Sequence, residues 1–140
     1  MVDTGIKEFV LSDNVSHAEV ASVNFDQWIL TVGMRAYKKP NDSVAGMFHI
    51  IFTNIVGFRV LDEGQMLNFP WKKLSESQSF VHRIDGDGWA EIEISARNMI
   101  LQKSAVEYVI ITSNECVSVI AHEPPKLITT GNKLLRDCNE

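Results

Sequence analysis

Two long runs of alternating apolar and polar residues constrain the fold of this chain more than any other feature. In Trp28–Tyr37 the even positions are apolar up to Ala36, while the odd positions are mixed. In Phe48–Val60 the even positions again carry the apolar side chains, with the exception of Asn54. Because successive side chains of a β-strand point to opposite faces, this period of two predicts strands with one apolar face. The polar segment 38–43 between the runs predicts the loop of a β-hairpin.

The second run is long for a single strand. We expect a bend or bulge near Asn54–Gly57, where the polar Asn54 interrupts the apolar face. Upstream, His17–Phe25 also alternates, and Asn24–Gln27 has the composition of a turn that leads into the strand at Trp28. The first half of the chain is therefore predicted to be an antiparallel meander of three strands.

A second hairpin is predicted near the C-terminus. Tyr108–Thr112 and Cys116–Ala121 are apolar and rich in β-branched residues, and they flank the turn-forming segment 113–115. His122–Pro125 should end the second of these strands, because proline cannot donate a hydrogen bond to a sheet.

The middle of the chain and its end are less regular. Gly64–Leu74 is compatible with a short helical turn, and Trp89–Leu101 fits both a strand and a helix. The helix is favoured, since Asp87 could cap it and two glutamates follow in its first turn. Residues 129–140 are predicted to form a loosely ordered tail unless Leu134–Leu135 dock it. We predict a single domain over 1–140, mainly β within the β-rich α+β class, with a barrel-like or sandwich sheet and one or two short helices.

Charge and composition exclude several classes of function. The 140 residues have a net charge of −5, with acidic and basic residues interspersed, which disfavours nucleic acid and anionic membranes as partners. The N-terminus lacks the pattern of a secretory signal, and the apolar stretch 45–61 alternates as a strand does. Two cysteines, Cys116 and Cys138, do not form a disulfide framework or a zinc motif, so we expect a reduced, cytoplasmic protein.

Motifs that carry chemistry are missing from the sequence. The four histidines are scattered singly, without the spacing that places two ligands on one metal ion. Asp85 and Asp87 lie in an Asp-Gly-Asp-Gly segment that lacks the later ligands of a calcium loop, and Asp62-Glu63-Gly64 reads as a solvated turn. No nucleotide or nucleophile-elbow motif is present. We therefore expect no catalytic residue, no metal and no cofactor, and the chain is not expected to be an enzyme.

One candidate interaction surface contains an aromatic residue in a polar neighbourhood. Trp71 is followed by two lysines, which is the setting of many interaction hot spots, although the same residue could instead cover an open end of the sheet. The acidic residues Asp62, Glu63, Asp85 and Asp87 complete this candidate surface.

Three segments together resemble a group of small, uncharacterised bacterial proteins. These segments are Phe52–Gly64, Tyr108–Thr112 and Cys116–Pro125: a strand with an acidic turn, followed by a late hairpin that ends in Pro-Pro. The chain is similar to proteins found among the immunity proteins of bacterial toxin systems. This resemblance implies a protein whose task is to bind another protein, such as a toxin, and it implies no catalytic residue.

Two further hypotheses remain open at this point. A β-barrel that binds a small ligand, or acts on it, would use a pocket at Asn54 and Trp28, because pockets are mostly apolar with a few polar groups. Self-association through an edge strand would instead give a homo-oligomer.

Overall fold

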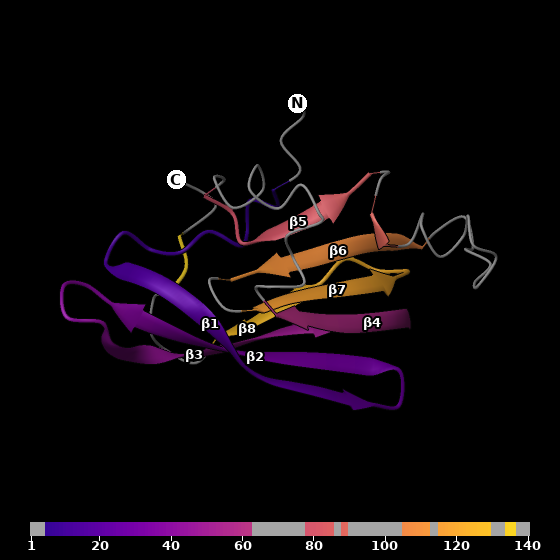
Figure 1. Ribbon diagram of the computed structural model, residues 1–140, viewed down its shortest axis with the longest axis horizontal. Coiled ribbons are helices and arrows are strands. Elements are labelled where there is room, and N and C mark those ends of the chain that lie inside the picture. The colour runs from indigo at the N-terminus through magenta and orange to yellow at the C-terminus, as the bar shows by residue number, and fades with distance from the viewer. Residues whose placement is uncertain are drawn as a thin grey trace.

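The computed structural model describes residues 5–62, 78–85, 88–89, 105–112, 115–129 and 134–136 (Figure 1). Within these residues the chain forms eight β-strands, and the predicted mainly β class is confirmed. The strands are β1 (Val15–Asp26), β2 (Ile29–Lys38), β3 (Ser43–Phe52), β4 (Ile55–Asp62), β5 (Val81–Ile84), β6 (Val106–Ile111), β7 (Glu115–Ala121) and β8 (Lys126–Thr129).

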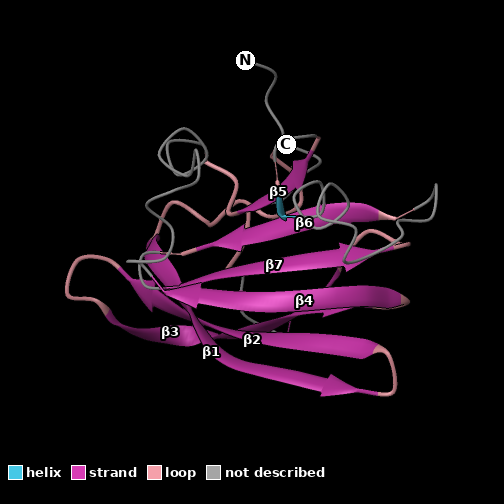
Figure 2. Ribbon diagram, turned by 45° about the vertical axis from the view of Figure 1, so that its right-hand side comes forward, coloured by secondary structure: helices cyan, strands magenta, loops and turns pink. Residues whose placement is uncertain are grey.

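The strands form two sheets that pack as a sandwich. The first sheet has the order β1-β2-β3-β8 and the second has the order β4-β7-β6-β5, with every neighbouring pair antiparallel. Figure 2 shows β5, β6, β7 and β4 side by side in one sheet and β1, β2 and β3 in the other. Since no pairing joins β1 or β8 to β4 or β5, the described strands do not close into a barrel.

The turn between β1 and β2 lies two residues later than the sequence predicts. Asp26 pairs with Ile29, which leaves Gln27 and Trp28 as the loop of a two-residue hairpin. These two residues have φ angles of 49° and 66°, the positive values that a type I′ turn requires at both positions. The prediction that Trp28 begins the apolar face of a strand was therefore wrong, and its side chain is instead exposed at the tip of the hairpin.

The long run Phe48–Val60 is two strands in two different sheets. β3 ends at Phe52 in the first sheet and β4 begins at Ile55 in the second, so the link of Thr53 and Asn54 carries the chain across the sandwich. Asn54 has a φ of 51°, a left-handed conformation that asparagine tolerates better than most residues. The predicted break at this position is confirmed, whereas the prediction of one continuous strand was wrong.

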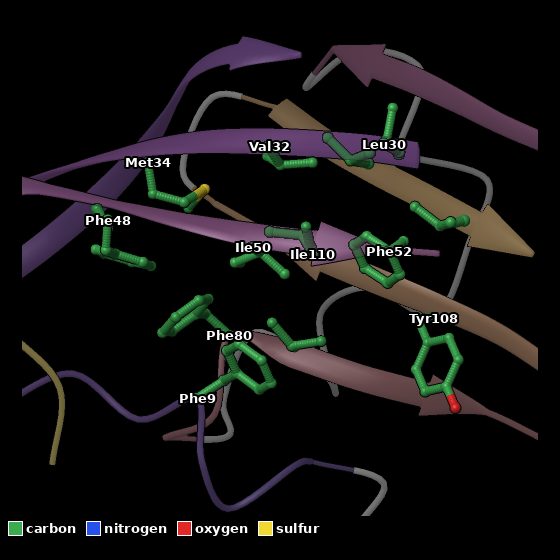
Figure 3. Close-up of a cluster of buried hydrophobic side chains, with 14 of the residues drawn as sticks. Phe9, Leu30, Val32, Met34, Phe48, Ile50, Phe52, Phe80, Tyr108 and Ile110 are labelled. Atoms are coloured by element: carbon green, nitrogen blue, oxygen red, sulfur yellow. The ribbon is translucent and has the colours of Figure 1, made fainter. Parts of the chain in front are cut away.

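The predicted apolar face fills the space between the sheets. The even positions from Leu30 to Ala36 in β2 and from Phe48 to Phe52 in β3 have no exposed surface, and side chains of β6 and β7 oppose them from the second sheet (Figure 3). Phe9, from the segment before β1, packs edge-on against Phe80 with ring centroids 5.8 Å apart. The fully buried side chains of this core include Leu30, Val32, Met34, Phe48, Ile50, Phe52, Ile110, Val117 and Val119.

The late hairpin is present as predicted, and a further strand follows it. β6 pairs with β7 from Val106↔Ala121 to Ile111↔Cys116. After the two prolines the chain returns to the first sheet as β8, which pairs with β3, for example at Ile50↔Leu127. The strands β5 and β8 are short, with four residues each, and the sequence analysis did not anticipate either of them.

Both ends of the described chain are tied to the sandwich. Gly5 forms a bridge with His82 of β5, and the Ile6 amide donates a hydrogen bond of 3.0 Å to the carbonyl of Val81. Near the C-terminus, Leu134 and Leu135 are buried, and Leu135 forms a bridge with Leu11. The helical segments predicted at 64–74 and 89–101 lie outside the described residues, apart from Trp89.

Candidate protein interface

The end of β1 and the strand β4 belong to different sheets and are joined by side-chain contacts, with no strand pairing between them. The ring of Phe25 on β1 lies 5.6 Å from that of Phe58 on β4 and 6.2 Å from that of Trp28, measured between centroids. Phe58 and Val60 alternate along β4 and therefore share one face of the strand, and the exposed Val56 lies at the pairing irregularity between Ile55 and Gly57. We call Phe25, Trp28, Val56, Phe58 and Val60 the aromatic seam.

Most of the aromatic seam is accessible to solvent. Trp28 is 68% exposed and Phe25 is 46% exposed, while Val56 and Val60 are exposed by about two fifths. Large apolar side chains that gather on a surface mark sites of interaction more often than single exposed ones do. The seam is therefore the described surface with the strongest aromatic character.

The backbone of β4 is also available at the seam. β4 is the last strand of the second sheet and pairs only with β7, so one of its edges has no strand partner in the described part of the chain (Figure 1). In an antiparallel strand, alternate residues direct their N–H and C=O groups away from the paired neighbour. These groups offer hydrogen bonds beside an apolar surface.

Acidic residues lie at the ends of the seam. Asp26 is exposed at the hairpin tip, Asp62 is exposed where β4 ends, and Glu123 is exposed beside the start of β4. The basic residue of β4, Arg59, alternates with Phe58 and Val60 and therefore points to the opposite face of the sheet. Of the described charged residues at the ends of the seam, these three are acidic, in line with the net charge of −5.

Asn54 fixes the crossover between the sheets rather than facing the buried core. Its amide donates a hydrogen bond of 3.4 Å to Glu123, and the Thr53 hydroxyl donates to the same carboxylate. The carbonyl of Asn54 accepts from the backbone N–H of His122 at 3.2 Å. Asn54 and Trp28 thus lie at the same end of the sandwich, both exposed, whereas the apolar row expected to line a pocket fills the core.

The acidic residues that the sequence singled out are not all described, and those that are do not meet. Asp62 ends β4, whereas Asp85 follows β5, and these two strands form opposite edges of the second sheet. Asp85 accepts a hydrogen bond from Arg83 Nε at 3.2 Å in an exposed ion pair. Glu63, Trp71 and Asp87 lie outside the described residues.

A buried polar layer covers the outer face of the second sheet. Glu107 on β6 is 5% exposed, and its carboxylate accepts a hydrogen bond of 3.3 Å from the Trp89 amide. The Arg59 guanidinium lies 5.0 Å from the centroid of the Trp89 ring, a cation–π contact. A Cβ atom on Gly88 would come within 2.5 Å of Glu107 Oε1 and 2.8 Å of Ile84 Cγ2, so a larger residue at this position would have to displace these side chains. Glu107 and Arg59 therefore hold residues 88–89 against the sheet.

The thiol in this layer is unreactive. Cys116 is fully buried, and burial raises its pKa to about 12, although the nearby Ser118 hydroxyl and Arg59 oppose the rise. Because the thiolate is the nucleophilic form, a protonated thiol under other side chains carries no catalysis. Burial also raises the pKa of the Tyr108 phenol.

A cluster around His17 on the outer face of the first sheet was not anticipated. The His17 ring stacks on Tyr37 at 4.7 Å and lies between the carboxylates of Glu19 and Asp42, at 3.8 and 3.9 Å. The pairing irregularity between Val15 and His17 brings Ser16 into the cluster, although neighbouring residues of a regular strand point apart.

The chemistry available to this cluster is limited. Ser16 Oγ lies 3.0 Å from His17 Nδ1, but its shorter contact is the hydrogen bond of 2.7 Å that it donates to Asp42. A serine whose hydroxyl donates its hydrogen bond to a carboxylate is not activated by the imidazole. Among the described residues, no group of three or more His, Cys, Asp or Glu side chains is arranged to hold a metal ion. The cluster instead connects β1 to the loop between β2 and β3.

Comparisons with known proteins add no functional assignment. No protein family, curated protein or solved structure matches this chain. No helix in the described part of the chain is long and apolar enough to cross a membrane.

Proposed function

We propose that this protein is a non-enzymatic protein-binding module and that the aromatic seam is its binding surface. The observation that carries the proposal is that Phe25 contacts both Trp28 and Phe58 at the surface of the sandwich, where Trp28 is 68% exposed and Phe25 46%. Tryptophan and other large aromatic residues dominate the energetics of protein interfaces, because each covers much area at little entropic cost.

The surroundings of the seam favour a protein over a small ligand. Small ligands are held in concave sites that enclose most of their surface. Trp28 instead projects from the tip of a hairpin, and the apolar face behind it is filled by core side chains. A protein partner can cover such a projecting surface and exclude water from around Trp28.

A toxin is the partner class that the resemblance to immunity proteins implies. The acidic residues at the ends of the seam and the net charge of −5 support a basic partner, because complementary charge accelerates association and favours the correct partner. The free, fully buried Cys116 fits a cytoplasmic protein. On this proposal the protein neutralises its partner by occupying the partner's surface and not by modifying it.

Affinity capture with matched variants tests the proposal. Wild-type protein, Trp28→Ala and the control Ile128→Ala are immobilised at equal density and exposed to an extract of the native host. Ile128 is 48% exposed and pairs with His49 on the outer face of the first sheet, away from the seam. We expect one protein to be retained by the wild type and the control but to be depleted at least tenfold on Trp28→Ala. Equal retention by all three would refute the role of the seam.

A further inference from the structure

We propose that the partner binds as an extended, basic segment that adds a strand to β4, along the edge that pairs with no other described strand. This inference rests on the proposed function and specifies its geometry. Edge strands are templates for pairing with another chain, because their outward N–H and C=O groups have no strand neighbour. Peptide recognition by strand addition uses those groups for affinity and nearby side-chain sites for specificity.

The other described edges are less suited to strand addition. The segment before β1 covers the edge of β5, through the bridge of Gly5 with His82 and the hydrogen bond from Ile6 to Val81. β8 has only four residues. β1 is long, but its pairing with β2 is irregular at two positions, and such bulges turn an edge away from a flat partner.

β4 combines the features that the other edges lack. Its pairing with β7 has one irregularity, between Ile55 and Gly57, and is regular from Gly57↔Ile120 to Asp62↔Glu115, so the last six residues of the edge follow an undistorted strand. β4 also contributes three residues to the seam, with the half-exposed Val56 and Val60 before and after Phe58 in the strand. An added strand would place every second side chain on the side of the seam, in contact with the rings of Phe25 and Trp28.

The acidic residues around β4 indicate that the added segment is basic. Glu123 lies at the start of β4, where it binds Asn54, Asp26 follows Phe25 at the hairpin tip, and Asp62 lies at the end of β4. The nearest lysine along the chain from Glu123, Lys126, pairs with Ile51 and lies on β8, at the edge of the first sheet opposite to β1. A second copy of this chain would bring the same carboxylates together, and like charges repel across an interface. A segment with lysine or arginine at alternate positions would meet them favourably.

Synthetic peptides test this geometry directly. The probe is an eight-residue peptide that alternates lysine and valine and so matches the eight residues of β4. Two further peptides carry N-methyl groups on all lysines or on all valines, which removes the backbone donors on one edge of the strand while leaving the side chains intact. A peptide with glutamate in place of lysine controls for charge. Binding is measured by the amide NMR shifts and hydrogen exchange of β4.

Strand addition predicts an asymmetric result. The unmodified peptide should bind and protect alternate β4 amides, and only one of the two N-methylated peptides should lose affinity, by at least tenfold, because one edge of the added strand faces β4. The glutamate peptide should bind at least tenfold more weakly. No binding of the unmodified peptide at millimolar concentration, or equal binding of both N-methylated peptides, would overturn the inference.

Protein variants separate this inference from the proposed function. Val60→Lys places a charge on the edge and should weaken the peptide at least tenfold, whereas Met47→Lys, at a similarly exposed position on the outer face of the first sheet, should not. If Trp28→Ala still abolishes capture from extract but Val60→Lys leaves peptide binding unchanged, strand addition is wrong while protein binding stands. If Trp28→Ala leaves capture unchanged, the proposed function itself fails.

Discussion

Replacing Asn54 tests how the chain passes between the two sheets. The residue has a φ of 51°, and its side chain makes one long, exposed hydrogen bond of 3.4 Å to Glu123. Alanine at this position would retain the left-handed backbone at a cost of about 1–2 kcal/mol relative to a right-handed conformation, a cost that asparagine bears more easily. Glycine has no such steric cost, but it destabilises the folded state by about 0.5–1 kcal/mol because it loses more conformational entropy on folding.

These two costs predict that glycine is more stable than alanine at position 54, the reverse of their usual order. Asn54→Gly should lie within about 0.5 kcal/mol of the wild type, and Asn54→Ala should be destabilised by about 1 kcal/mol or more. Urea unfolding followed by tryptophan fluorescence measures both, and the slope with denaturant should not change because neither variant alters the buried surface. If alanine is as stable as glycine here, the left-handed crossover is refuted. A large loss for both variants would point instead to a buried role for the amide, as a pocket residue would have.

Two further predictions concern the core and the buried thiol. Phe48 is fully buried and Trp28 is 68% exposed, so Phe48→Ala should cost about 3–5 kcal/mol in urea unfolding and Trp28→Ala less than about 1; equal losses would contradict the assignment of these faces. The pKa of Cys116 is raised from 9.0 to about 12, so its contribution to stability is complete below pH 9 and is lost as the pH rises toward 12. The wild type should therefore lose up to about 1.4 kcal/mol of unfolding free energy per pH unit across that interval because of this thiol, and Cys116→Ala should not show this loss. If the unfolding free energies of variant and wild type fall in parallel with pH, the thiol is not buried.

The sequence predicts the interior of the sheets better than their connections. The alternation in β2 and β3 is easy to recognise because the apolar residues 30–36 and 48–52 on one face are completely buried, and a slip of one residue would expose this apolar set. The hairpin of β6 and β7 is equally clear, since both strands are rich in β-branched residues. Alternation does not reveal which sheet a strand joins, and the run 48–60 was therefore interpreted as one strand although Asn54 divides it.

Turns and short strands were harder to predict for physical reasons. A two-residue hairpin is usually recognised in a sequence by Asn-Gly or Asp-Gly, but Gln27-Trp28 adopts the same positive φ angles without those residues. Trp28 was consequently assigned to a strand. β5 and β8 contain four residues each, which is too short for a periodic pattern to be distinguished from a loop.

The candidate site is composed of residues that only the fold brings together. Phe25 and Phe58 lie far apart in the sequence and belong to different sheets, so no local pattern predicts their contact. Gly88 and Glu107 are likewise neighbours only in space. Trp28 was selected from the sequence for a pocket, and its exposure on a hairpin tip gives it a different proposed role.

Site-specific photo-crosslinking is the most direct test of the seam as a protein-binding surface. The photoreactive amino acid p-benzoylphenylalanine replaces Trp28 in one protein and Ile128 in another, and both are illuminated in cells of the native host. Both positions are exposed, but only Trp28 belongs to the seam. We expect one discrete covalent adduct from position 28 and none from position 128. The same adducts from both positions, or none from position 28 when a partner is captured by the intact protein, would contradict the account.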